Sequence, residues 1–421
     1  MVLLAPRAQT ALASCGFALV GVLAVAQTAA AARVTFDQVL ELGGAAPAIR
    51  ATQAERTARE REDRGVGGTL GPTSITVMPG AALTPGQGAD FDFQLNATQG
   101  WNLQGLGAKA RETAGLERQT LGVEQRLVAL ETRLAAARLW IELRTVEELE
   151  GIVARGVELA QQGVQLARRG KEAGVSTDAQ LREAEAIRAE LEAQSLALEG
   201  RHFDVENQLR NFVPTSEADP QLVTAGSWPE PVLPLPAEIR AAIARLDALP
   251  QVALAEMRKR AAAARALEIA ATRAPLLTVG AQVERGTGNV WVGYGILGVT
   301  FNGPQGQRAV SVARAADERG ASELELARRA ARADFSAAAH EWEHTEQTLA
   351  LLEKQTLPSL EALVVARRRA LDLGEETRAT GIEAERRLRA AQEMRVEAQG
   401  RAVLARVRLW LLLASLRRGE P

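Results

Sequence analysis

The chain has 421 residues and a formal net charge of −2, which excludes the strongly basic field of a typical nucleic-acid-binding protein. Aromatic residues make up only 4% of the sequence, and the surplus lies in Ala, Arg, Glu and Leu. This composition is typical of long helices rather than of one large mixed core, so it favours an elongated, mainly helical protein.

The N-terminus has the features of an export signal, which we expect over residues 1–32. Arg7 precedes the apolar run ALASCGFALVGVLAVA, and small residues follow it. The run is too short for a membrane-spanning helix, so cleavage is favoured over anchoring. Cys15, the only cysteine, lies in this run, and lipidation there is the less favoured alternative. Removal of the signal would leave no thiol, which fits a bacterial envelope protein without disulfides.

The rest of the chain contains an internal duplication. Residues 163–185 and 363–385 align without a gap, and AAARLW (135–140) matches AAAHEW (337–342). Two copies are too few for a solenoid. We therefore expect two equivalent halves joined by a linker. The expected boundaries are a first repeat over 33–213, a proline-rich linker over 214–249, a second repeat over 250–417 and a tail over 418–421.

Each repeat is expected to begin with a helix, over 34–64 and about 250–273, followed by two strands. The second strand of the first pair alternates most clearly. Its apolar Phe91, Phe93, Leu95 and Ala97 are interleaved with polar Asp92, Gln94, Asn96 and Thr98. This period of two predicts a strand with one apolar and one polar face. The second pair is expected over 276–284 and 289–302.

A very long helix is expected after each pair of strands, over about 108–173 and 306–372. At 1.5 Å per residue each would run roughly 100 Å, and Pro358 predicts a kink in the second. Each helix then reverses at a tip and returns, to about residues 211 and 416. Glycines stop the helices and threonines are candidate caps for the returning ones. The tip residues are Gly174, Thr177, Gly374 and Thr377.

Four strands of about ten residues have the length to cross a membrane but are too few to close a barrel. Strands in lipid need a closed barrel, because an open edge would leave backbone groups without partners. Either the strands stay outside the membrane, or several chains share one barrel. Three chains would supply twelve strands, with the long helices continuing as a sheath into the periplasm.

These features resemble the TolC family of outer-membrane channel proteins. The resemblance rests on the signal peptide, the opening segment 34–51, the two strand–strand–helix units and the Gly-x-x-Thr tips. It implies a mainly α fold in which long helical hairpins form an α-barrel tunnel. It also implies a homotrimer whose four strands per chain complete a 12-stranded β-barrel in outer-membrane lipid, with the helical part in the periplasm of a Gram-negative bacterium.

The resemblance further implies a passive conduit in a tripartite efflux or type I secretion system, without catalysis or cofactor. The hairpin tips would dock a periplasmic adaptor and an inner-membrane transporter. The segment 300–309 resembles a turn frequent in heavy-metal efflux members. At the tunnel entrance, where the family carries acidic residues, one matching position is Glu383 and the other is Thr380. Glu376 replaces an expected basic partner, so the resemblance does not by itself imply the family's usual gate bonding.

Two other interpretations compete with a channel. HEWEH (340–344) has the zinc-protease spacing, with His340 and His344 as ligands and Glu341 as general base. The only other histidine, His202, lies in the other repeat, so we favour polar residues on a long helix, with metal binding as a minor alternative. The second is a periplasmic coiled-coil adaptor without a membrane barrel. The alternation over 91–98 favours the channel.

Aromatic residues near the expected strand ends could form a belt at the membrane surface or pack in the interior. They are Trp101, Trp291, Tyr294 and Phe301.

Overall fold

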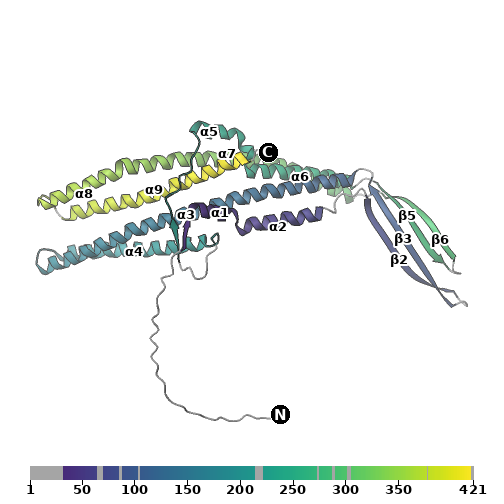
Figure 1. Cartoon of the computed structure of the whole chain (residues 1–421), viewed down its shortest axis with the longest axis horizontal. Helices are drawn as coiled ribbons and strands as arrows, with labels where there is room; N and C mark the ends of the chain where they lie inside the picture. Colours follow the sequence, from purple (N-terminus) through teal and green to yellow (C-terminus); the bar gives the residue numbers. More distant parts are fainter. Residues whose placement is uncertain are drawn as a thin grey trace, which may run out of the picture.

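A computed structural model describes residues 32–63, 70–84, 88–102, 105–213, 221–272, 275–286, 290–300, 305–376 and 378–418. The molecule is elongated: its long helices run side by side, with a β-sheet at one end and two helical hairpin tips at the other (Figure 1). The expected signal peptide with Cys15, the tip residue Thr377 and Phe301 lie outside the described residues.

The first half begins with a short strand and two helices, not with the single helix expected over 34–64. Thr35 caps the first helix by accepting a hydrogen bond from the Gln38 backbone, and Pro47 starts the second helix. The residue before a proline avoids helical geometry, which explains the break. The elements are β1 (Ala32–Thr35), α1 (Phe36–Gly44), α2 (Pro47–Glu62), β2 (Leu70–Thr84), β3 (Gly88–Asn102), α3 (Leu106–Glu172) and α4 (Asp178–Leu209).

The second half repeats the order of two strands, a long helix and a returning helix. Its elements are α6 (Pro250–Ala271), β5 (Leu276–Gly286), β6 (Val290–Thr300), α7 (Gln305–Leu351), α8 (Leu357–Asp372) and α9 (Arg378–Arg418). One π turn, Leu352–Thr356, joins α7 to α8. It lies just before Pro358, which has no N–H to donate to the preceding turn.

The expected linker contains regular structure in its described part. Strand β4 (Leu222–Ala225) pairs in parallel with β1, and α5 (Pro236–Ala242) is followed by a 3₁₀ turn, Ile243–Ala248. A second sheet contains the longer strands in the order β2-β3-β5-β6, with each neighbouring pair antiparallel. The β3–β5 pairing therefore joins the two halves of the duplication.

The core lies midway along the helices, where the two halves meet. Trp140 of α3 is fully buried, packs edge-on against Phe36 at 5.4 Å and donates a hydrogen bond to the Val34 carbonyl at 3.0 Å. Phe335 of α7 and Leu409 of α9 belong to the same apolar cluster. Burial of large side chains from α3, α7 and α9 in one cluster holds the halves together.

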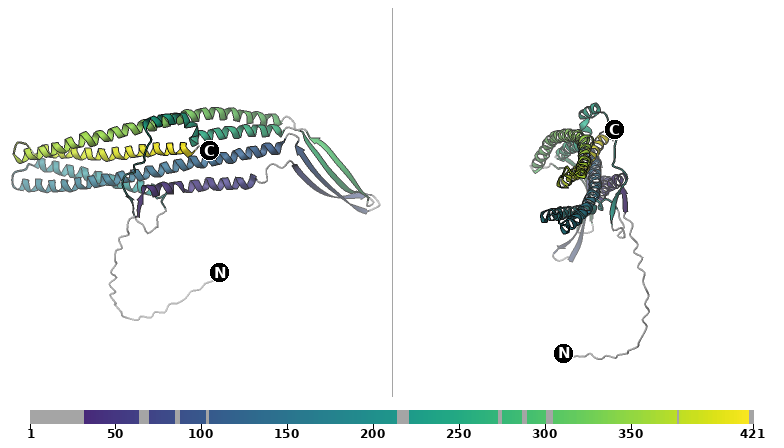
Figure 2. Two further views of the ribbon diagram at one scale, coloured as in Figure 1. Left: turned by 45° about the horizontal axis from the view of Figure 1, so that its top comes forward. Right: turned by 90° about the vertical axis from the view of Figure 1, so that its left-hand side faces the viewer.

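Beyond the core, the two hairpins α3–α4 and α8–α9 lie side by side, and the helices form a curved layer when viewed from the tips (Figure 2). Polar contacts join the returning helices: Arg386 of α9 pairs with Glu190 of α4 at 3.3 Å, and Gln194 donates to Glu393 at 3.0 Å. Within the described residues, none of the helices has an apolar stretch long enough to cross a membrane.

Candidate functional site

The four-stranded sheet exposes a broad apolar face. Strand register places side chains of the same face opposite one another, so Val77 of β2, Leu95 of β3 and Val283 of β5 lie in one row. The next rows of this face add Ile75, Ala97, Val279, Ala281, Trp291, Leu297 and Val299. Leu297 is 77% exposed. Thr73, Gln99 and Arg285 also lie on this face, which is otherwise apolar. An exposed and mainly apolar surface of this extent marks contact with lipid or with another protein.

The opposite face of the sheet is mainly polar. Its central row contains Thr76, Asn96, Gln282 and Tyr294. The Tyr294 hydroxyl donates to Glu284 at 2.9 Å, and Gln282 donates to the same carboxylate at 3.3 Å. Tyr294 therefore lies on the polar face, not in an apolar-face aromatic belt. The two faces thus differ as the lipid and lumen faces of a membrane barrel do.

Two tryptophans lie at opposite ends of the apolar face. Trp101 is opposite Leu277 near the helical end of the sheet, and Trp291 is opposite Arg285 near the far end. The partners are about 26 Å apart along β5 at about 3.3 Å per residue. Strands of outer-membrane barrels are tilted by about 35–45°, so this separation spans roughly 20 Å of the roughly 25 Å apolar band that aromatic residues flank.

Strands β2 and β6 form the two edges of the sheet, and among the described residues no strand pairs with either outer edge. Long apolar strands with unpaired backbone groups are templates for pairing with another chain. Since β2 is parallel to β5 and β6 is antiparallel to it, the two edges run in opposite directions.

The hairpin tips at the other end of the molecule share one backbone design. Gly174 and Gly374 have φ angles of 72° and 76°, the left-handed conformation that glycine adopts most easily. The Val175 amide donates to the Gly170 carbonyl at 2.8 Å, and the Glu375 amide donates to the Ala370 carbonyl at 2.9 Å. These bonds complete a Schellman motif at each tip.

The first tip continues into a helix cap. Thr177 accepts from the Gln180 backbone at 3.2 Å, and the Gln180 side chain accepts from the Thr177 amide at 2.9 Å. This is a full capping box at the start of α4. Lys171 and Asp178 form an ion pair beside it. The hydrogen bond and charge of Lys171 hold the pKa of the Asp178 carboxyl below its usual value.

The second tip has different polar contacts, and these include the gate candidates. Thr380 donates to Glu376 at 2.9 Å, and Glu376 also pairs with Arg367. Glu383 is half exposed and pairs with Arg387 of its own helix at 2.9 Å. Glu376 and Thr380 are therefore brought together, whereas Glu383 belongs to a separate contact one turn further along α9.

Two glutamate carboxylates accept hydrogen bonds from the backbone of strand β4, and so attach the segment between the two halves to helices α3 and α4. Glu206 of α4 accepts from the Leu222 amide at 2.6 Å, and Glu147 of α3 accepts from the Thr224 amide at 2.7 Å. Burial raises the pKa of the Glu147 carboxyl above its ordinary value, although hydrogen bonds from Thr224 and the charges of Arg144 and His202 act against this. Sequence reasoning missed this attachment, because four-residue strands show no detectable periodicity.

The H-E-x-x-H residues lie near the end of α7. The rings of His340 and His344 are exposed and nearly parallel, with centroids 6.3 Å apart. Glu341 instead pairs with Arg408 of α9 at 3.1 Å. The described residues contain no group of three or more His, Cys, Asp or Glu side chains placed to hold a metal ion. This arrangement lacks the third protein ligand of a catalytic zinc site.

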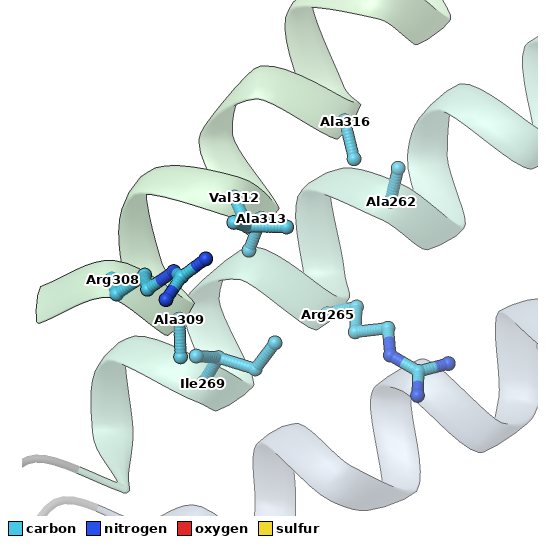
Figure 3. A pocket seen from close by; sticks show the side chains of 8 residues that line it. All are labelled: Ala262, Arg265, Ile269, Arg308, Ala309, Val312, Ala313 and Ala316. Carbon is cyan, nitrogen blue, oxygen red and sulfur yellow. The ribbon is translucent and has the colours of Figure 1, made fainter. Parts of the chain in front are cut away.

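A groove of about 550 Å³ lies between α6 and α7 near the sheet (Figure 3). Ala262, Ile269, Ala309 and Val312 are among the residues that line it, and Arg265 extends toward α3, where it pairs with Glu117 at 3.2 Å. The described lining residues include no acid, histidine or hydroxyl. The groove therefore offers neither a nucleophile nor a general base.

No family model and no curated protein matches the chain, but solved structures do. The CmeC outer membrane channel of Campylobacter jejuni matches with a TM-score of 0.76 and 11% identity, over 91% of this chain and 86% of that chain. The fold is that of a TolC-type outer-membrane channel. The expectation of a mainly helical fold with long hairpins and a small strand contribution is confirmed.

Two further structures have the same TolC-type fold. The outer membrane protein VceC of Vibrio cholerae has a TM-score of 0.69 and 17% identity, over 90% of this chain and 95% of that chain. The open state of the MtrE outer membrane channel of Neisseria gonorrhoeae has a TM-score of 0.71 and 14% identity, over 90% and 88%. The likeness in fold thus extends over nearly the whole length of both chains in each comparison.

Proposed function

We propose that the chain is one subunit of a homotrimeric outer-membrane channel, a passive conduit in a tripartite efflux or type I secretion system. The observation that carries this proposal is the sheet, which has one apolar exposed face, one polar face and two unpaired edges. A sheet of this kind cannot stand alone in lipid, because the edge amides and carbonyls would have no partners.

A barrel closed by several copies of the same chain would give the backbone amides and carbonyls of those edges hydrogen-bond partners. Because β2 and β6 run in opposite directions, β6 of one copy can pair with β2 of the next and continue the antiparallel pattern. Three copies of a four-stranded sheet give a barrel of twelve strands, an even number within the known range. The apolar face would then contact lipid and the polar face would line the lumen.

The helices support a conduit that continues from the barrel. Their packing order, α2 against α3, α3 against α6 and α6 against α7, follows the order of the strands to which they connect. The helices also form a curved layer (Figure 2). Three such layers placed around one axis would enclose a lumen that runs from the sheet to the tips, in the periplasm.

The tips are the proposed docking points for a periplasmic adaptor and an inner-membrane transporter. They lie at the end of the molecule opposite the sheet (Figure 1). Each presents an exposed apolar side chain, Val175 at 80% and Leu373 at 73% exposed. Rigid turns at Gly174 and Gly374 and the cap at Thr177 would hold these side chains in place. Thr377 belongs to the same proposal, and Glu383 is proposed to face the tunnel entrance.

Disulfide cross-linking between copies tests this proposal. One cysteine replaces Val77 on β2, and a second is moved along the same face of β6 through positions 291, 293, 295, 297 and 299. Residues in adjacent strands lie within the distance range of a disulfide. We expect covalent trimers from membranes at one register of the series.

The matched control keeps the β6 series but places the fixed cysteine at Leu95 on β3. Strand β5 lies between β3 and β6, so this pair should give no cross-link within or between copies. Monomers alone across the whole Val77 series would contradict a shared barrel.

A further inference from the structure

We propose that His340 and His344 form a binding site for a divalent transition-metal ion on the exposed side of α7. Both rings are exposed, nearly parallel and 6.3 Å apart. Neither ring has a hydrogen-bond or ion-pair partner among the described residues. Imidazole suits Cu²⁺, Ni²⁺ and Zn²⁺, whereas Mg²⁺ and Ca²⁺ prefer oxygen ligands.

The geometry of the helix sets the distance between the two histidine side chains. Residues four apart lie one above the other on a helix, with Cβ atoms about 5–6 Å apart. A metal about 2.0–2.1 Å from one nitrogen of each ring would place the ring centres about 5 Å apart in tetrahedral geometry. The rings therefore need to approach by about 1 Å and to turn out of their parallel arrangement, because the in-plane lone pairs of parallel rings do not converge on one ion. Exposed histidines can make this turn, since rotation about χ2 is broad.

The position of the pair leaves it open to an ion from solvent. His340 and His344 follow the buried Ala338 by about 200° and 240° around the helix axis, on the side away from the core. This chain supplies two ligands, since no group of three is found among the described residues. Water would complete the coordination. The site therefore binds a metal without the closed shell of a structural zinc site.

The site is distinct from a zinc protease in spite of the H-E-x-x-H spacing. Glu341, which would act as general base, pairs with Arg408 of α9 at 3.1 Å. The equivalent positions of the first half are occupied by Arg138 and Glu142, and Glu142 pairs with Arg201 at 3.1 Å. The pair of histidines is therefore a feature of the second half alone, independent of the symmetry that builds the proposed channel.

Cu²⁺ titration of the full-length, tag-free protein in detergent tests the proposal, with calorimetry for affinity and electron paramagnetic resonance for the ligands. We expect one Cu²⁺ per chain and a spectrum with two nitrogen ligands. His340→Ala or His344→Ala should each weaken binding on the order of a hundredfold, because the second imidazole no longer adds its local concentration. His202→Ala is the matched control, since its ring is held by Glu150 at 3.1 Å.

Equal Cu²⁺ affinity in the wild type and in the His340→Ala and His344→Ala variants would overturn the proposal, as would loss of binding in His202→Ala alone. Exposed side chains on a helix should not affect folding, and helical circular dichroism and oligomer mass check this for each variant. Because the oligomer mass is measured separately, failure of the metal site would leave the proposed channel untouched, and the reverse also holds.

Discussion

Trp140 and Trp342 occupy equivalent positions in the two halves of the chain, but only Trp140 donates a hydrogen bond through its ring nitrogen. Its partner is the Val34 carbonyl at 3.0 Å. The ring nitrogen of Trp342 is buried without a partner among the described residues, although the ring packs against the same core. The duplication therefore preserved the residue and not its polar contact.

This difference predicts that substitution by phenylalanine destabilises the protein more at Trp140 than at Trp342. Trp140→Phe removes one of two hydrogen bonds to the Val34 carbonyl, which still takes part in the parallel pairing of β1 with β4, and should cost about 0.5–1.5 kcal/mol, with a further cost for the lost ring volume. Trp342→Phe removes a donor that has no partner among the described residues, so only the cost of the lost ring volume remains. Thermal unfolding followed by helical circular dichroism measures both. Equal losses in the two variants would contradict the assigned contacts.

The left-handed turns at the tips predict that two glycine-to-alanine substitutions change the stability of the protein in opposite directions. Gly174→Ala has room for the added methyl group, so its cost is that of a left-handed alanine, roughly 1–2 kcal/mol. Gly163→Ala, inside α3 and also with open space, should stabilise its helix by roughly 0.5–1 kcal/mol.

Hydrogen exchange of the Val175 amide reports on this turn directly, because that amide donates to Gly170. Exchange should accelerate in Gly174→Ala and stay the same or slow in Gly163→Ala. Slower exchange in Gly163→Ala, with no change in Gly174→Ala, would show that opening of the helix, rather than of the turn, limits exchange.

The assignment of the two sheet faces predicts that arginine is tolerated at one of two adjacent positions of β2 and not at the other. Val77 lies on the apolar face and Thr76 on the polar face. Val77→Arg should cost about 2–4 kcal/mol per copy if that position lies near the membrane midplane, and should abolish insertion. Thr76→Arg should still assemble. Fractionation of inner and outer membranes measures both, and equal insertion of the two variants would contradict the assignment.

The attachment of β4 predicts a pH dependence through Glu147. The pKa of this carboxyl is raised in the folded protein from an ordinary value of 4.5, chiefly by burial. The folded state therefore holds the proton more tightly than the unfolded state. The protonated Glu147 carboxyl therefore contributes to the stability of the folded state. This contribution is fully present at pH values below the ordinary pKa and is lost as pH rises through the pKa of the folded state.

Protection of the Thr224 amide from hydrogen exchange, corrected for the intrinsic rate, should accordingly increase from pH 7 to pH 5. Glu147→Gln should remove this increase while keeping an acceptor for Thr224. Glu147→Ala should reduce protection at both pH values by about 1–3 kcal/mol, because the amide loses its acceptor. A Gln variant that keeps the full pH dependence would assign it to another group.

Local signals made much of the fold predictable. Gly174 and Gly374 end helices in a conformation set by a few neighbouring residues, and alternation in β3 divides its side chains between two faces. The long helices follow from apolar spacing that continues for many turns without proline. These features depend on nearby residues, so a single sequence carries them.

Contacts between distant segments were not predictable in the same way. The parallel pairing of β1 with β4 joins the start of the chain to the segment between the halves, and neither strand is long enough for a period. Sequence alone does not separate Tyr294 from the other aromatic residues near the strand ends, whereas the strand register places it on the polar face beside Glu284. The contacts of Glu376 with Arg367 and Thr380 likewise depend on how one helix returns past another.

The most direct test of the account is the conductance of the purified oligomer in a planar bilayer, with its mass determined on the same sample. Outer-membrane fractions extracted in mild detergent should give a trimer that opens discrete channels. A soluble or monomeric protein without conductance would contradict the shared barrel, and the apolar face of the sheet would then have to be a docking surface for another protein.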